Sequence, residues 1–121
     1  MNAKVINIHT ATDGTFTWQG AFHGKIHALE LLLGSGGSAL STPDIDVTED
    51  NHSVSFLSVN GVASDTVYYP STFVEAADGT TAALVGTGMK AAVSAICIGV
   101  LKVAVTGGGD TKRGKLKVYW D

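Results

Sequence analysis

The chain has 121 residues and a net charge of −3, and charged residues make up 16% of it. This charged fraction is well below the quarter that is typical of soluble domains, so either protein partners cover much of the surface or the β-core is deep. A nucleic-acid-binding face is not expected, because such faces show clustered positive charge. The single cysteine excludes an internal disulfide framework and any cysteine-based zinc site.

The first residues alternate between apolar and polar side chains. Ile6 and Ile8 share one face of the segment 4–9, and Trp18 lies in a second alternating segment, 15–19, beyond Asp13-Gly14. Two alternating runs around Asp-Gly predict a hairpin. Residues 1–12 are expected to form either an extended N-terminal strand or an arm that becomes ordered on a neighbouring subunit.

The segment 24–33 fits two structures. Its Ile26, Leu29 and Leu33 have helical spacing, and Gly34 is a plausible helix end. No N-cap precedes the segment, however, and its neighbours all read as strands. A strand is therefore predicted here from context.

The segment 34–41 is rich in glycine and serine. It lacks the Lys-Ser/Thr pair that opens the helix of a phosphate-binding P-loop, and it also lacks the spacing of the dinucleotide fingerprint. We therefore expect a solvent loop.

Three short strands separated by turns are expected between Pro43 and Pro70. They cover 44–48, 54–59 and 66–69, with turns at 49–51 and 60–61. In the last strand, Tyr68 and Tyr69 are adjacent and must point to opposite faces, one inward and one outward.

The last third of the chain contains one more clear strand pair. A short strand is expected at 72–75, whereas 80–94 shows no regular period. The apolar run 91–101 is too short to span a bilayer, and its part 91–99 reads as a buried strand or a close packing surface. Two alternating segments then predict a closing hairpin, 101–105 with 116–120 around the glycine-rich turn at 106–114.

Eight or nine short strands at spacings of 8–12 residues, with little or no helix, predict one all-β domain over residues 1–121. A β-sandwich, jelly-roll-like, is the expected architecture. Its core is expected to contain the inward-facing residues of the clearest strands, namely Ile45, Val47, Phe56, Val103, Val105, Leu116 and Val118.

No residue set is suited to catalysis or metal binding, so we expect no enzyme activity, no cofactor and no obligatory metal. His23 and His27 have no acidic third ligand at a helpful spacing, and the acidic stretch 44–50 lacks the pattern of an EF-hand loop. Cys97 lies in an apolar context that raises a thiol pKa, which makes it a poor nucleophile.

Aromatic and basic side chains provide the candidate interface. Aromatic residues dominate interface energetics, and the basic turn before the last strand suits an acidic partner. The same aromatic residues also suit stacking on sugar rings, so a carbohydrate-binding β-sandwich module is a rival interpretation. The candidate interface residues are Trp18, Tyr68, Tyr69, Lys112, Arg113 and Trp120.

Over residues 22–120 the order of these signals resembles a group of small virion structural proteins of tailed bacteriophages. The matching pieces are Gly24-Lys25-Ile26, the threonine-containing strand 43–48, a turn near Asn60, Tyr68-Tyr69-Pro70, Ala77-Asp78-Gly79 and the strand 101–105. The segments 28–33 and 80–95 fit the pattern least well. Proteins of this group carry no catalytic residues.

The resemblance implies a capsid decoration (cement) protein on the virion surface, synthesised in the host cytoplasm. Its partners would be the major capsid protein and further copies of itself, with a trimer as the first expectation and a dimer as the second. Neither nucleic acid nor a membrane is an expected partner. A head-tail connector or a tail or baseplate subunit is the alternative within the same group.

Overall fold

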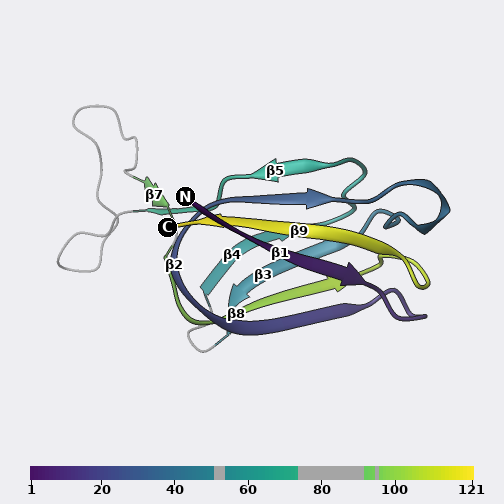
Figure 1. Ribbon diagram of the computed structural model, residues 1–121, viewed down its shortest axis with the longest axis horizontal. Helices are drawn as coiled ribbons and strands as arrows, with labels where there is room; N and C mark the ends of the chain where they lie inside the picture. Colours follow the sequence, from purple (N-terminus) through teal and green to yellow (C-terminus); the bar gives the residue numbers. More distant parts are fainter. Residues whose placement is uncertain (51–53, 74–91, 95) are drawn as a thin grey trace.

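The computed structural model describes residues 1–50, 54–73, 92–94 and 96–121. Within these ranges the chain forms nine strands and a single 3₁₀ turn, Gly36–Ser38 (Figure 1). The predicted all-β class is confirmed, and so is the strand over the ambiguous segment 24–33. The strands are β1 (Asn2–His9), β2 (Phe16–Leu32), β3 (Asp44–Glu49), β4 (Val54–Val59), β5 (Thr66–Tyr68), β6 (Ser71–Phe73), β7 (Ala92–Ser94), β8 (Ile96–Thr106) and β9 (Arg113–Trp120).

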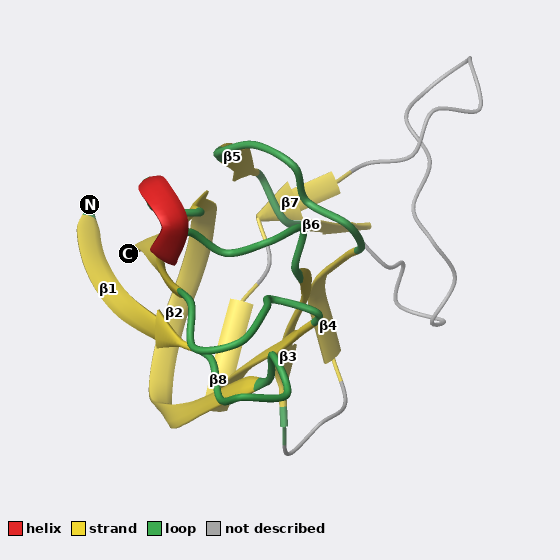
Figure 2. Cartoon of the chain, turned by 90° about the vertical axis from the view of Figure 1, so that its right-hand side faces the viewer, coloured by secondary structure: helices red, strands yellow, loops and turns green. Residues whose placement is uncertain are grey.

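A long, bent strand, β2, organises the fold. Its residues 16–25 pair with β8, and its residues 26–32 pair with β9 on one side, while part of this second half pairs with β5 on the other. One antiparallel seven-stranded sheet, in the order β1-β9-β2-β8-β3-β4 with β5 beside β2, therefore folds over on itself at β2. The two resulting layers enclose the core (Figures 1 and 2), and β6 and β7 form a separate two-stranded sheet.

A β-bulge explains the helix-like spacing in β2. Ile26 pairs with Trp120 and Ala28 with Tyr119, so His27 is an extra residue in the strand. Without a bulge, Ile26 and Leu29 would point to opposite faces, because side chains alternate along a strand. The bulge resets the alternation, and Ile26, Leu29 and Leu31 are all fully buried.

Two of the predicted hairpins are wrong. β1 pairs with β9 rather than with β2, and β9 pairs with β1 and β2 rather than with β8. Both connections cross between the layers and bind each other there: the Gly108 amide donates to the Gly14 carbonyl at 3.0 Å, and the Thr10 hydroxyl donates to the Gly109 carbonyl at 2.6 Å. Crossing connections let the strands of the seven-stranded sheet turn their apolar faces to a shared core, which an isolated hairpin cannot bury.

The segment between Pro43 and Pro70 is partly as expected. β3 and β4 pair antiparallel. The turn at 60–61 does not close a hairpin, however, because β5 pairs with β2 on the other layer. The Gly61 amide donates instead to the Asp44 carboxylate at 2.8 Å. The region 80–94, for which no period was found, lies mostly outside the described residues.

All seven predicted core residues are buried. Both layers contribute to one apolar cluster, and its members alternate with exposed residues along the strands. The cluster consists of Ile6, Ile8, Phe22, Ile26, Leu29, Leu31, Leu33, Leu40, Ile45, Val47, Phe56, Val62, Cys97, Leu101, Val103, Val105, Leu116 and Val118.

Candidate interaction surfaces

The two tryptophans complete the core. Trp18 and Trp120 both pack against the buried cluster, and the Trp120 ring meets Phe22 edge-on with centroids 5.1 Å apart. The Lys4 ammonium lies 5.4 Å from the centroid of the Trp18 ring. A tryptophan in such a position contributes packing area, and its ring face is not a free platform for a ligand.

The two tyrosines point in opposite directions, as predicted. Tyr68 is half-buried against the core, whereas 76% of Tyr69 is exposed. At the other end of the sheet, the Lys112 ammonium donates to the Gly37 carbonyl, and Arg113 is exposed. Arg113 and Trp120 begin and end β9, so about 23 Å of strand separates them. The six candidate interface residues therefore do not form one patch.

An exposed apolar surface, which the sequence analysis missed, lies at the start of β8. Ile96 is 57% exposed and Ile98 is 60% exposed, so the expectation of a buried strand over 91–99 is wrong at these two positions. Val54 of β4 is 43% exposed, and it lines a hollow of about 210 Å³ together with Ile96, Ile98 and Glu49. We call Val54, Ile96 and Ile98 the apolar end.

Alternation along β8 places these isoleucines outside. Cys97 and Leu101 are fully buried, so residues of the opposite parity must face away from the core. Ile96 and Ile98 pair with Lys25 and His23, which also lie on the outer surface. The sequence already contained this information. Cys97, Leu101, Val103 and Val105 are separated by even numbers of residues and share the inward face of the strand, so Ile96 and Ile98 must lie on the outer face.

A buried carboxylate lies beside the apolar end. Only 2% of Glu49 is exposed, and its Oε1 accepts a hydrogen bond from the Val100 amide at 3.0 Å. Burial, together with the charge of Glu49, raises the pKa of the Cys97 thiol to about 11. The thiol is therefore protonated at neutral pH and is a poor nucleophile.

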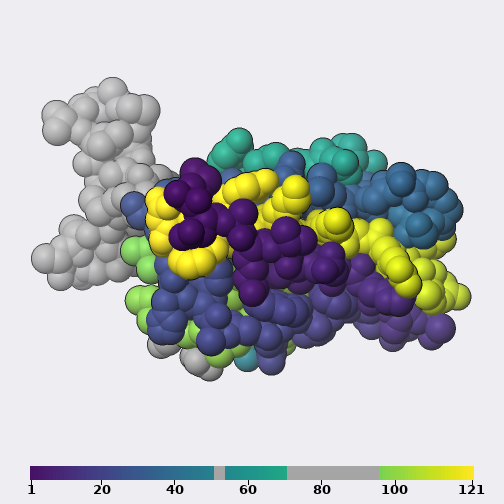
Figure 3. Space-filling view, in the orientation of Figure 1, coloured from purple at the N-terminus to yellow at the C-terminus, as the bar shows by residue number. Residues whose placement is uncertain are grey.

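The opposite end of the molecule carries a row of cations. Arg113, Lys115 and Lys117 alternate along the outer face of β9, the strand whose yellow atoms are visible on the side of the molecule that Figure 3 shows. Within the described part of the chain, their side chains make no hydrogen bond or ion pair. By contrast, the Lys102 ammonium lies 3.9 Å from the Asp50 carboxylate.

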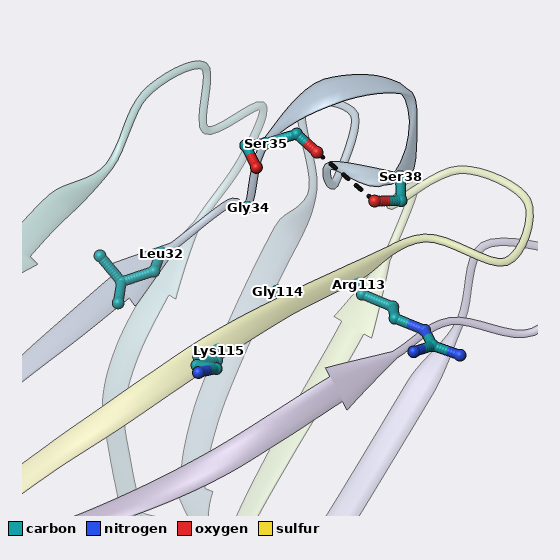
Figure 4. A pocket seen from close by; sticks show the side chains of 7 residues that line it. All are labelled: Leu32, Gly34, Ser35, Ser38, Arg113, Gly114 and Lys115. Atoms are coloured by element: carbon teal, nitrogen blue, oxygen red, sulfur yellow. Dashed lines mark hydrogen bonds between the residues drawn. The ribbon is translucent and has the colours of Figure 1, made fainter.

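Two hollows flank the first residues of this row. One, of about 340 Å³, lies between Arg113–Lys115 and the chain from Leu32 to Ser38 (Figure 4). The other, of about 390 Å³, lies between Arg113–Lys115 and the end of β1 at 7–9. We call the first one the β9 hollow.

In the described part of the chain, the histidines and the acidic stretch are not arranged as metal sites. His27 Nε2 hydrogen-bonds the Asp121 carboxylate at 2.7 Å, and this contact is the main cause that lowers the pKa of Asp121. Glu49 is buried while Asp46 of the same strand is exposed, so they do not converge. Among the described residues, no group of three or more histidine, cysteine or acidic side chains is placed to hold a metal ion.

No protein-family model, no curated protein and no solved structure matches this chain. In the described part of the chain, no helix is long and apolar enough to cross a membrane.

Proposed function

We propose that this chain is a virion structural protein of a tailed bacteriophage that decorates the capsid, binds the major capsid protein and stabilises the shell. The observation that carries the proposal is the apolar end. Ile96 and Ile98 stand outward on β8, each more than half exposed. Large branched apolar side chains in that position indicate a lasting protein contact, because water is an unfavourable neighbour for them.

The energetics of such a contact need no chemical step. Covering the exposed parts of Ile96 and Ile98 stabilises a complex by about 1–2 kcal/mol each. The cost of association reduces this gain, and binding through several copies of an oligomer restores it. Because a capsid shell is symmetric, we expect the protein to form a homo-oligomer, with a trimer as the first expectation and a dimer as the second. We place the protein on the capsid surface after synthesis in the host cytoplasm, and the proposal assigns it no enzyme activity.

The rival functions have less support. A carbohydrate-binding module needs open aromatic faces, whereas three of the four candidate aromatic residues, Trp18, Tyr68 and Trp120, pack against the core and Tyr69 alone of the four is largely exposed. A connector or a tail or baseplate subunit would use similar apolar contacts and differs in its position and copy number.

The proposal is tested by rebinding the purified chain to phage particles that lack it. We expect co-sedimentation that saturates at many copies per head. The double substitution Ile96→Ser with Ile98→Ser should weaken binding roughly tenfold or more. Val5→Ser, on the outer face of the other layer and 48% exposed, is the matched control and should bind as the unchanged chain does. If the double variant bound as tightly as the unchanged chain, the apolar end would not be part of the contact. If the unchanged chain did not bind to the particles at all, capsid decoration would be contradicted.

A further inference from the structure

β1 is an edge strand with one open side. It pairs with β9 over its whole length, Asn2–His9, and the ladder contains no bulge. In the described part of the chain no strand pairs with its other side, and its atoms lie at the surface of the molecule (purple in Figure 3). Such an edge presents a row of unpaired amides and carbonyls, which is a template for a further strand.

A hydrogen bond at the end of β1 shows which of its residues turn their backbone groups to the open side. The Thr10 amide donates to the Lys112 carbonyl at 2.9 Å, and these residues form the next pair after the ladder of β1 and β9. Along an antiparallel ladder, pairs that exchange hydrogen bonds alternate with pairs that do not. The even-numbered residues of β1 therefore bond β9. The backbone groups that face the open side belong to Ala3, Val5, Asn7 and His9, all of them exposed.

The other side of β9 gives the same assignment. Asp121, just beyond β9, exchanges both backbone hydrogen bonds with Lys25 at 3.0 Å. By alternation, the odd-numbered residues of β9 face β2 and its even-numbered residues face β1. The register pairs these even-numbered residues with the even-numbered residues of β1. Two independent contacts thus leave the odd-numbered residues of β1 for a further strand.

The other strands at the margins of this sheet carry features that hinder pairing. β5 has three residues, and β4 is bulged where its register with β3 shifts; short and bulged edges resist the addition of a strand. The only charged side chain of β1, Lys4, would normally protect an edge. Its ammonium lies instead 5.4 Å from the centroid of the Trp18 ring, on the other layer. The four residues with open backbone groups include no lysine, arginine or acid.

An antiparallel copy of β1 matches this open edge in both backbone and side chains. With Val5 opposite Val5 of the second copy, Ala3 lies opposite Asn7, and each of these pairs exchanges two hydrogen bonds. The two Val5 side chains, each 48% exposed, cover each other on the outer face, where β-branched pairs are favourable. No like charges meet in this register. We infer that β1 is a dimer interface, at which a second copy of this chain extends the sheet about a two-fold axis at Val5.

This dimer is compatible with the other surfaces of the molecule. Val5 pairs with Lys117 of β9, so the Lys117 side chains of the two copies lie three strand spacings apart. That distance of about 14 Å exceeds the Debye length of about 8 Å at physiological salt. Because the axis is perpendicular to the sheet, Ile96 and Ile98 of both copies face the same side. The seam selects a dimer over a trimer, and the inference does not depend on the proposed function.

Charge substitutions at Val5 test the two-fold axis. Val5→Glu and Val5→Lys each place like charges opposite each other, so each alone should weaken self-association roughly tenfold or more. An equimolar mixture of the two should form a heterodimer, because Glu then faces Lys. Val5→Ser keeps the backbone seam and is the uncharged control, which should associate within about fivefold of the unchanged chain. Sedimentation velocity from low micromolar to near-millimolar concentration measures association, and urea denaturation checks that each variant is folded.

Amide hydrogen exchange of the unchanged chain tests the edge without any substitution. As the concentration is raised, exchange at Ala3, Val5 and Asn7 should slow roughly tenfold or more, because these amides become bonded in the dimer. The amides of Lys4 and Ile6 bond β9 in the monomer as well, so their exchange should stay the same. NMR of the full-length, ¹⁵N-labelled chain resolves the two sets.

Four results would overturn the inference. The first is a chain that stays monomeric at near-millimolar concentration or forms a trimer, and the second is a mixture of the Glu and Lys variants that forms no heterodimer. The third is slowed exchange elsewhere in the chain with Ala3 and Val5 unchanged, which would place the contact on another surface. The fourth is slowed exchange at these amides only when phage particles are added, which would assign the edge to a capsid strand.

Discussion

At the close contacts of this sandwich, a few neighbouring atoms determine whether a position can carry a side chain. Gly114 of β9 lies over Leu40, and a Cβ there would come within 2.5 Å of Leu40 Cδ1 and 2.7 Å of the Leu32 carbonyl oxygen. By contrast, a Cβ on Gly37, in the nearby loop, would meet nothing within 4 Å. Of these two glycines, only Gly114 is sterically required.

Gly114→Ala should therefore destabilise the fold by about 1–3 kcal/mol, since overpacking forces Leu40 and the backbone to shift. Gly37→Ala is the control and should change the free energy of unfolding by about 0.5 kcal/mol or less. Urea denaturation followed by tryptophan fluorescence measures both. Equal midpoints for the two variants would show that Leu40 does not fill the space above Gly114.

The Cys97 thiol gives the fold a pH dependence at the alkaline end. Its pKa is raised to about 11 from an ordinary value of 9.0. Between these two pH values the unfolded thiol has lost its proton and the folded thiol keeps it, so the unfolded state binds fewer protons. Stability must then fall as pH rises from 9 to 11.

Comparison with Cys97→Ala isolates this contribution, because all other titrating groups are shared. We expect the stability advantage of the unchanged chain over the variant to shrink between pH 9 and 10.5 and to stay constant from pH 7 to 8.5. Urea midpoints at each pH provide the measurement. An advantage that is constant over the whole range would mean that the thiol titrates alike in both states.

At the scale of elements, the period-2 pattern identified strands and their faces but not their partners. Ile45, Val47, Leu116 and Val118 are buried as predicted, because inward parity is a local property of a strand. Pairing is not local: β1 and β9 are joined across nearly the whole chain. The closing hairpin was predicted because nothing in its turn distinguishes a hairpin from a connection that crosses between layers.

Residues of the candidate sites were likewise predicted where the sequence signal is local and missed where it is not. Tyr68 and Tyr69 were placed correctly because adjacent residues in a strand must point apart. Ile96 and Ile98 were missed because an apolar run reads as buried unless its parity is followed to Val105. The β9 hollow combines residues from 32–38 and 113–115, and no local pattern joins two such distant segments.

Cross-strand disulfides test this topology in a Cys97→Ala background. Val5 and Lys117 are paired residues of β1 and β9, and Cα atoms of such pairs lie within reach of a disulfide. Val5→Cys with Lys117→Cys should therefore oxidise to an intramolecular bond. Lys102→Cys with Lys117→Cys is the control: a β8–β9 hairpin would place these residues opposite each other, whereas here they lie on the outer faces of opposite layers.

Mass spectrometry and non-reducing electrophoresis would detect the bond. We expect it in the first variant and not in the second. A disulfide formed readily between positions 102 and 117 would restore the hairpin and contradict the crossing of the chain between layers.

The whole molecule has two different ends. The apolar end lies where β8 begins, and the cation row begins at the far end of β9, where Arg113 pairs with His9 at the end of β1. This arrangement separates the exposed apolar side chains of Ile96 and Ile98 from Arg113. It fits a protein that attaches by one end and presents the other to solution.

The most direct test of attachment to a phage capsid is imaging of the intact particle with the copies of this chain counted and located. The account predicts hundreds of copies distributed over the head, each with Ile96 and Ile98 turned toward the shell. A ring of six or twelve copies at the neck, or absence of the chain from purified particles, would contradict it.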